Sequence, residues 1–131
     1  NGRTYVAYCF QSIESYSKIG SAIGNGADNG KGTFVYTGFR PAFVMLKPST
    51  HTGHWRIMDA KREPFNNDNS SQLFANLEDI ESTGSATNKD FLSNGFKIKT
   101  DNTGVTSMNQ SGETYIYMAF AEMPFKYANA R

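Results

Sequence analysis

The sequence is poor in cysteine and in histidine. Its 131 residues contain one cysteine, Cys9, so no disulfide can form within the chain and the core must hold the fold together. Cys9 stands in an apolar run, which favours a small buried side chain over a reactive thiol. The two histidines, His51 and His54, have no further ligands at a zinc-binding spacing, so no metal centre is predicted.

Charge is scarce as well. Lys, Arg, Asp and Glu make up 19% of the residues, and the formal net charge is +1 without any basic tract. A surface that follows a phosphate backbone needs clustered Lys and Arg, so we expect no nucleic acid partner. No apolar run approaches the roughly 20 residues that a membrane-spanning helix needs, so no membrane insertion is expected.

Signatures of the common enzyme classes are also missing. There is no G-x-S-x-G elbow, no H-E-x-x-H, no C-x-x-C and no P-loop pattern. A glycosidase on a β-sandwich would need two carboxylates that converge across a sugar. In the acidic cluster Glu78–Glu81, the adjacent Glu78 and Asp79 would point to opposite faces of a strand. We therefore predict a protein that is not an enzyme.

What the sequence does have is aromatic residues and turn formers. Phe, Tyr and Trp make up 14% of the chain, and 12 glycines are spread along it. Short β-branched and aromatic runs alternate with turn signals, and no segment has the 3.6-residue period of a helix. We predict an all-β fold, an antiparallel two-sheet β-sandwich of the concanavalin A-like or jelly-roll type, with residues 1–131 as a single domain.

The strands expected in this sandwich follow from those runs. In chain order they are Thr4–Phe10, Ser17–Ile23, Thr33–Thr37, Phe43–Lys47, His54–Asp59, Phe96–Thr100 and Thr114–Glu122. Gln72–Leu77 fits either a short strand or a helical turn, and Glu78–Lys89 is expected to be irregular. Phe91–Gly95 ends in an Asn-Gly pair, which predicts a turn before the strand Phe96–Thr100. Gly24–Gly32 is rich in glycine and is predicted to be a long loop, as is the polar segment Lys61–Ser71.

The two end segments of the chain are near-copies. Thr4–Phe10 reads TYVAYCF and Thr114–Phe120 reads TYIYMAF. Both are apolar on both faces, which is typical of central strands, so we expect them to lie in the same sheet. Two explanations of the likeness stay open: central strands draw on few residue types, or the chain was cut from a tandem array.

Candidate binding residues are aromatic and amide side chains beside the loops. Rings stack on pyranose faces and Asn or Asp bind hydroxyl groups, whereas most rings here stand in strands and are expected to be core. The ligand-binding candidates are Tyr16, Asp28, Asn29, Phe65, Asn67 and Asp68, with Tyr127 as a further aromatic contact. Calcium would suit the oxygen atoms of these loops, but neither loop has the EF-hand pattern, so no cofactor is expected.

A succession of short strings runs from Thr4 to Phe125. In order they are TYVAYCF, ESYSKIGSAIGNG, FVYTGFRPAFVMLK, HWRIMDAKR, LFANLEDIES, DFLSNGFKI and GETYIYMAFAEMPF. This succession resembles a domain family of tail-fibre-like and other virion structural proteins of tailed bacteriophages, especially marine ones. The resemblance implies a virion location, a concanavalin-like or laminin-G-like sandwich without assigned catalytic residues, and a place in the C-terminal part of a longer protein.

Two functions are compatible with this resemblance. The first is a receptor-binding module that contacts a host cell-surface glycan or other receptor through loops, with weak sites strengthened by several copies. The second is a purely structural domain that packs against other virion proteins, further copies of this chain included. Exposed aromatic side chains beside Asn or Asp in loops would favour the first function, and a broad apolar surface would favour the second.

Overall fold

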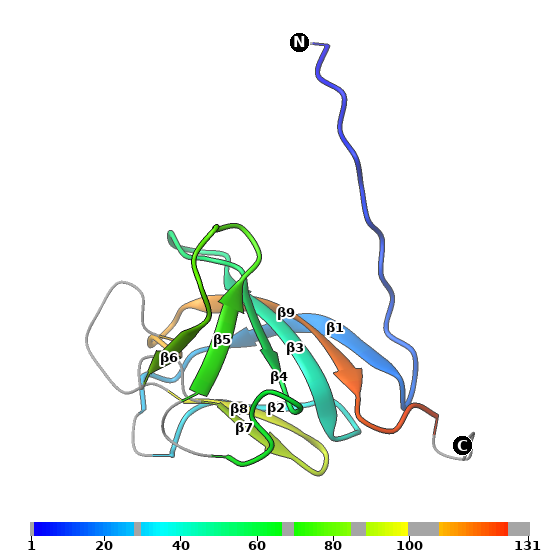
Figure 1. Cartoon of the computed structure of the whole chain (residues 1–131), viewed down its shortest axis with the longest axis vertical. Helices are drawn as coiled ribbons and strands as arrows, with labels where there is room; N and C mark the ends of the chain where they lie inside the picture. Colours follow the sequence, from blue (N-terminus) through cyan, green and yellow to red (C-terminus); the bar gives the residue numbers. More distant parts are fainter. Residues whose placement is uncertain (1, 28–29, 67–69, 85–88, 100–107, 126–131) are drawn as a thin grey trace.

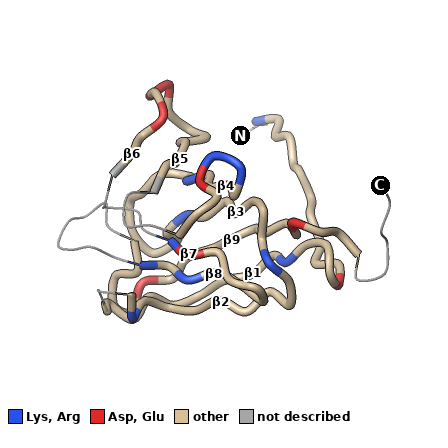
Figure 2. Tube along the Cα trace, turned by 60° about the horizontal axis from the view of Figure 1, so that its bottom comes forward, with Lys and Arg blue, Asp and Glu red and all other residues tan. Residues whose placement is uncertain are grey.

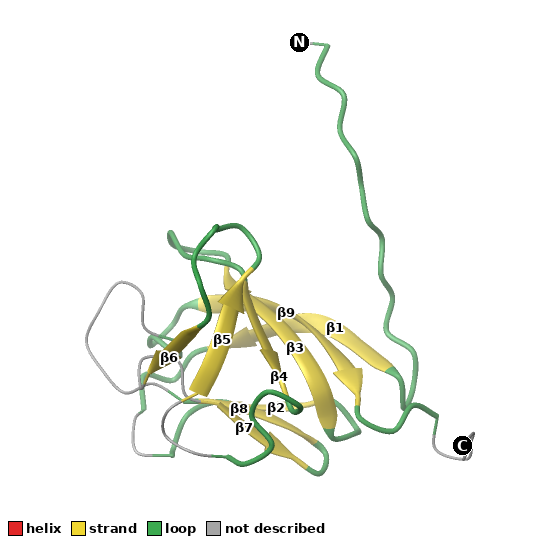
Figure 3. Ribbon diagram, viewed as in Figure 1, coloured by secondary structure: helices red, strands yellow, loops and turns green. Residues whose placement is uncertain are grey.

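Two antiparallel sheets make up the computed structural model of this chain (Figures 1 and 3). It describes residues 2–27, 30–66, 70–84, 89–99 and 108–125, and no helix occurs among them. The prediction of an all-β, two-sheet antiparallel sandwich is confirmed. The finer assignment to a concanavalin A-like or jelly-roll type stays a prediction.

The larger sheet has six strands in the order β1-β9-β3-β4-β5-β6. Their bounds are β1 Ser17–Ile23, β3 Pro41–Pro48, β4 Arg56–Asp59, β5 Ser70–Phe74, β6 Ser82–Gly84 and β9 Thr114–Ala121. β9 pairs antiparallel with β1 on one side and with β3 on the other, so the predicted strand at the C-terminal end is confirmed as central. The ambiguous segment Gln72–Leu77 begins as a strand, and the expected irregular stretch before Lys89 contains the short strand β6.

The smaller sheet has three strands in the order β2-β8-β7. They are β2 Phe34–Tyr36, β7 Lys89–Leu92 and β8 Gly95–Ile98. β7 and β8 form a hairpin around Ser93 and Asn94, which confirms the turn predicted from Asn94-Gly95. β2 lies within the predicted strand Thr33–Thr37, and β8 begins one residue before the predicted strand Phe96–Thr100.

Apolar side chains from both sheets meet in one core. Its buried members are Val35, Phe39, Val44, Leu46, Met58, Ala60, Phe91, Phe96, Ile98, Met108, Tyr115, Tyr117 and Ala119. The rings of Phe96 in β8 and Tyr117 in β9 meet edge-on across the sandwich, with their centroids 5.4 Å apart. Each large side chain of this kind contributes about 1.5 to 3 kcal/mol by its burial, so the core replaces the disulfides that the chain lacks.

The glycine-rich loop after β1 is tied to the segment before β9 by one buried amide. Asn109 is fully buried and has a φ of 65°. Its Oδ1 accepts hydrogen bonds from the backbone N–H groups of Asn25 and Thr33, at 3.1 and 3.2 Å. Its Nδ2 donates to Asn25 Oδ1 and to the Ala27 carbonyl, at 2.7 and 2.9 Å. The described part of the predicted loop Gly24–Gly32 is therefore a loop with a fixed anchor.

The strand predicted at Thr4–Phe10 does not form. This segment, which we call the arm, is extended and runs away from both sheets (Figure 1). The exposed fractions of its large apolar side chains are 80% for Tyr5, 79% for Val6, 83% for Tyr8 and 54% for Phe10. Cys9 is exposed as well, so the prediction of a buried thiol is wrong. The central position that the arm was expected to share is filled by β9 alone, and β1 lies at the edge of the sheet.

Candidate functional site

The edges of the two sheets differ in how they are closed. An edge strand presents backbone N–H and C=O groups that can pair with another chain unless something covers them. The edges here are β1 and β6 in the larger sheet and β2 and β7 in the smaller one. β6 is followed in the chain by residues outside the described ranges, which leaves β1, β7 and β2 as the edges to compare.

The first half of the outer edge of β1, at Ser17 and Ile19, is covered by the residues that lead into it. Ile13 and Ser17 exchange backbone hydrogen bonds of 3.0 and 2.9 Å around a tight turn. Farther along, Ser12 Oγ accepts a hydrogen bond of 2.9 Å from the Ile19 N–H. The Ser12 side chain therefore bonds to β1 where the backbone of a paired strand would otherwise bond. The residues before Ser12 leave the sheet and continue into the arm.

The outer edge of β7 is closed by side chains from elsewhere in the chain. The Phe91 N–H donates to Asn66 Oδ1 at 2.8 Å, and the Phe91 carbonyl accepts from Asn66 Nδ2 at 3.0 Å. Arg40 Nη1 donates to the same carbonyl at 2.8 Å, while Arg40 Nε pairs with Glu122 at 3.0 Å. This edge offers little to a further strand.

The outer edge of β2 is open. Hydrogen bonds from the Ile98 N–H to the Thr33 carbonyl and from the Thr37 N–H to the Asn94 carbonyl direct the odd-numbered residues of this segment toward β8. The backbone groups of Phe34 and Tyr36 therefore point away from β8. Within the described ranges they have no hydrogen-bond partner, and the two side chains are 44% and 65% exposed.

A pocket of about 630 Å³ lies beside this open edge, between β2 and the start of β1. Residues 36–39 and Met123 line one side, and the turn before β1 lines the other. The buried hydroxyls in its wall are already used, because Ser17 Oγ donates to the Gln11 carbonyl at 2.9 Å and Thr37 Oγ1 to the Phe39 carbonyl at 2.6 Å. Among the described residues, the only charged side chains in its lining are Glu14 and Lys18, so the pocket suits an extended peptide better than a reacting substrate.

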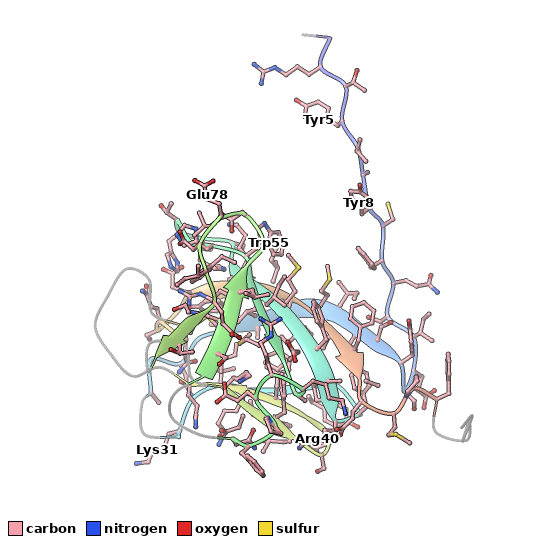
Figure 4. The ribbon with its side chains drawn as sticks, viewed as in Figure 1. Tyr5, Tyr8, Lys31, Arg40, Trp55 and Glu78 are labelled. Atoms are coloured by element: carbon pink, nitrogen blue, oxygen red, sulfur yellow. The ribbon has the colours of Figure 1, made fainter. Side chains whose placement is uncertain are left out.

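The loops at the far end of β3 and β4 hold a second cluster, around Trp55 (Figure 4). Trp55 is half-buried, and its backbone N–H donates to Asn76 Oδ1 at 2.9 Å. Asn76 Nδ2 lies 3.2 Å from His54 Nδ1, and the rings of His54 and Phe74 meet edge-on at 5.5 Å. Trp55 and Asn76 thus bring an aromatic and an amide residue together in surface loops, and these are the two residue types that a sugar site would use.

Glu113 lies near this same end of the sandwich, just before β9. Thr50 Oγ1 donates a hydrogen bond to Glu113 Oε2, and His51 Nδ1 lies 2.8 Å from the same oxygen. These two contacts, that of Thr50 first, hold the pKa of Glu113 below its ordinary value. His51 is therefore half-buried against a carboxylate and is part of the structure of this loop.

Buried charged side chains have polar or charged partners. Lys89 Nζ lies 3.7 Å from Glu63 Oε2, and both residues are buried. Burial lowers the pKa of the Lys89 ammonium, and the charge of Glu63 opposes that shift. The buried Arg56 Nη1 donates to Gln72 Oε1 at 2.8 Å. These groups are shielded from solvent, so we assign them a structural role.

The structure places two of the predicted binding residues. Tyr16 lies in the turn just before β1, stacked on Phe125 with ring centroids 5.3 Å apart. Phe65 is 78% exposed and lies in the segment after β4, next to the Asn66 that closes the β7 edge. No contact between Tyr16 and Phe65 occurs in the described ranges. The other candidates, Asp28, Asn29, Asn67, Asp68 and Tyr127, lie outside those ranges.

Tyr36 is the residue that sequence reasoning missed. It stands in a predicted strand, where most rings were expected to be core, and only the order of the strands shows that its strand is an unpaired edge. Its ring lies over Gly38, where an added Cβ would be 3.7 Å from the Tyr36 hydroxyl. No pattern in the sequence distinguishes this exposed ring from the buried ones.

The charged side chains do not gather into one binding face. Lys and Arg are interspersed with Asp and Glu over the sandwich, and the arm carries neither sign (Figure 2). In the part of the chain that the structure describes, no three His, Cys, Asp or Glu side chains gather to hold a metal ion. The same residues include no helix that is long and apolar enough to cross a membrane.

Comparison with known proteins identifies the family of the chain. A family model described as a domain of unknown function (DUF7483) matches residues 1–124. The chain belongs to this family. The match takes in the arm as well as the sandwich, so the arm is part of the DUF7483 domain. Neither the curated proteins nor the solved structures gave a match.

Proposed function

We propose that this domain is a non-catalytic structural module of a bacteriophage virion, which joins other virion proteins through its arm. The virion location rests on the resemblance carried by the strings from Thr4 to Phe125. The joining role rests on the arm, and it favours the structural function over the receptor-binding one.

The observation that carries the proposal is the exposure of the arm. Tyr5, Val6, Tyr8 and Phe10 are all more than half exposed within one short segment. Burial of each such side chain against another surface would contribute about 1.5 to 3 kcal/mol. Between Thr4 and Phe10 no charged residue keeps the segment in water. A segment of this composition favours contact with another protein.

The single cysteine provides the test. Cys9 is exposed on the arm, so it should react with a maleimide in the isolated domain at low concentration. In the intact virion that carries this domain, the arm is covered under our proposal, and Cys9 should react at least about tenfold more slowly. Equal reactivity in the free domain and in the virion would refute the proposal.

A charged substitution gives a second test of the same role. Tyr8→Asp should lower the yield of complete virions while leaving the unfolding of the isolated domain unchanged, because the arm contributes nothing to its core. Ile80→Asp is the matched control, since Ile80 is 88% exposed in the loop between β5 and β6. A normal yield with Tyr8→Asp would contradict the proposal.

The Trp55 cluster favours a second candidate function, binding of a host-surface glycan. The indole can stack on a pyranose face, and the exposed amide of Asn76 has further hydrogen-bonding capacity toward hydroxyl groups. Trp55→Ala should weaken binding to a glycan from the host envelope by about tenfold or more. Tyr5→Ala, on the arm, is the control and should leave glycan binding unchanged. Absence of binding to host envelope glycans by the wild-type domain would remove this candidate.

A further inference from the structure

We infer that the arm of one copy of this chain pairs as an added strand with the open edge of β2 in a second copy. This inference rests on the proposed joining function and names both the partner and the surface. Addition of a strand to a free sheet edge uses main-chain hydrogen bonds for affinity and side-chain pockets for specificity. The chain supplies a donor segment and an acceptor edge of this kind.

The donor is the arm. It is already extended, and it consists of β-branched and aromatic residues with high strand propensity. Its sequence is close to that of β9, the strand that occupies the centre of the larger sheet. The family match includes the arm, so the segment is part of the domain.

The acceptor is identified by comparing the hydrogen bonds that already cover each sheet edge. Ser12 and Ile13 cover the β1 edge at Ile19 and Ser17, and Asn66 with Arg40 covers the β7 edge at Phe91. In β2, the N–H and C=O groups of Phe34 and Tyr36 point outward from the sheet. A strand added along Ser17 and Ile19 of β1, or at Phe91 of β7, would have to break these hydrogen bonds, whereas a strand added to β2 would break none that the described residues make.

The pocket beside β2 provides an apolar surface on which the side chains of an added strand could pack. The pocket beside β2 is bordered by Tyr36, Met123 and Ile13, which are 65%, 70% and 38% exposed. Phe34 and Tyr36 are two residues apart and share the outer face of β2, so alternate arm side chains would lie on that face, beside these two rings and the pocket at Tyr36. The apolar surfaces of donor and acceptor would then cover one another.

The geometry favours a second copy over the arm's own domain. The Ile13–Ser17 turn and the Ser12–Ile19 contact set the direction in which the arm leaves, and that direction leads away from the sandwich (Figure 1). Two copies can each donate an arm and accept one. Such a symmetric exchange repeats the same interface twice, which strengthens an assembly whose single contacts are short.

Sedimentation of the whole chain over a concentration series tests this inference first. We expect a reversible association in wild type that deletion of residues 1–10 abolishes. Tyr36→Pro removes an N–H that points outward from β2 but makes no bond to β8, so it should weaken association by about tenfold or more. Urea unfolding of Tyr36→Pro confirms that the sandwich remains folded. Ile80→Pro, in an exposed loop, is the matched control and should associate as wild type does.

Disulfide trapping locates the contact. In Phe34→Cys or Tyr36→Cys, mild oxidation should join the new thiol to Cys9 of a second copy, with a dimer yield about tenfold above that of Ile80→Cys. Wild type measures the background from Cys9 alone. A yield equal to that of Ile80→Cys, at both positions, would overturn β2 as the acceptor.

A wild-type chain that stays monomeric up to millimolar concentration would overturn the inference as a whole. Protection of Cys9 in the virion would then still support the joining function, with a different protein as the partner. Association that survives deletion of the arm would overturn the inference as well. The two proposals can therefore fail separately.

Discussion

The arm and β9 have almost the same sequence and opposite surroundings. In β9, Tyr115 and Ala119 are fully buried and Tyr117 nearly so, whereas Tyr5 and Tyr8 of the arm extend into solvent (Figure 4). β9 has β1 on one side and β3 on the other, and the arm has neither. Apolar residues on both faces make a segment suitable for a central position, but only neighbouring strands can provide one.

Side-chain volume explains why the two segments are not interchangeable. The inward residues of β9 are Tyr115, Tyr117 and Ala119, and aligning TYVAYCF with TYIYMAF places Ala7 where β9 has Tyr117. Tyr117 packs on Phe96 and lies across Gly20, where an added Cβ would be 3.0 Å from its hydroxyl. The arm in that position would leave a cavity, which is strongly destabilising.

Matched thiols should give the largest contrast between the two segments. Cys9 aligns with Ala119, which is fully buried. In a Cys9→Ser background, Ala119→Cys should react with a maleimide about a thousandfold more slowly than Cys9 does in wild type, because labelling then requires unfolding. Stopped-flow labelling at low concentration measures both rates, which should converge in denaturant. Comparable rates in native buffer would contradict the central position of β9.

Truncation of the aligned tyrosines should separate the segments by several kcal/mol. Tyr115→Ala removes a fully buried ring and the hydroxyl that accepts the Gln110 N–H at 3.0 Å. We expect a loss of about 3 to 5 kcal/mol in the free energy of unfolding. Tyr5→Ala, its counterpart on the arm, should change that free energy by less than about 0.5 kcal/mol. Urea unfolding at micromolar concentration makes the comparison, and equal losses would refute it.

Substitution of Asn109, the buried amide that precedes β9, should give the next largest loss of stability. The arm has no counterpart to this residue. Asn109→Ala removes a fully buried amide with four hydrogen bonds and places alanine at a φ of 65°. We expect a loss of about 3 kcal/mol in the free energy of unfolding. Asn109→Gly should recover about 1 kcal/mol of this loss, because glycine adopts a positive φ without strain but cannot replace the hydrogen bonds. Full recovery with glycine would show that the hydrogen bonds contribute little.

Acid sensitivity should give the smallest contrast. The pKa of Glu113 is lowered in the folded state by hydrogen bonds from Thr50 and His51, so the unfolded chain binds the proton more readily. The carboxylate therefore stabilises the fold at neutral pH, and this contribution is lost as pH falls through the lowered pKa. Glu113→Gln should reduce the urea midpoint at neutral pH and flatten its decline in acid. Arg3 precedes the arm as Glu113 precedes β9, and Arg3→Gln should leave the dependence of the urea midpoint on pH unchanged.

Sequence reasoning succeeded where local chemistry decides the outcome. Alternating apolar residues and turn signals correctly predicted β1, β3, β8 and β9, and Asn94-Gly95 correctly predicted a hairpin turn. It failed at the arm and at Cys9, where the same local chemistry meets no neighbouring strand. It placed Tyr16 and Phe65 at the surface, but the open edge at Tyr36 depends on strand order, which residues distant in the chain determine.

The sequence by itself determined that this chain forms short antiparallel strands around an aromatic core, because strand propensity, turn residues and the missing helical period are local properties. Only the tertiary structure decided which of two near-identical segments became the central strand. That choice depends on contacts with β1, β3 and Phe96, and on the volume of a single ring, Tyr117, for which the arm has Ala7. Burial is a property of neighbours, and a sequence states only which residues are suited to it.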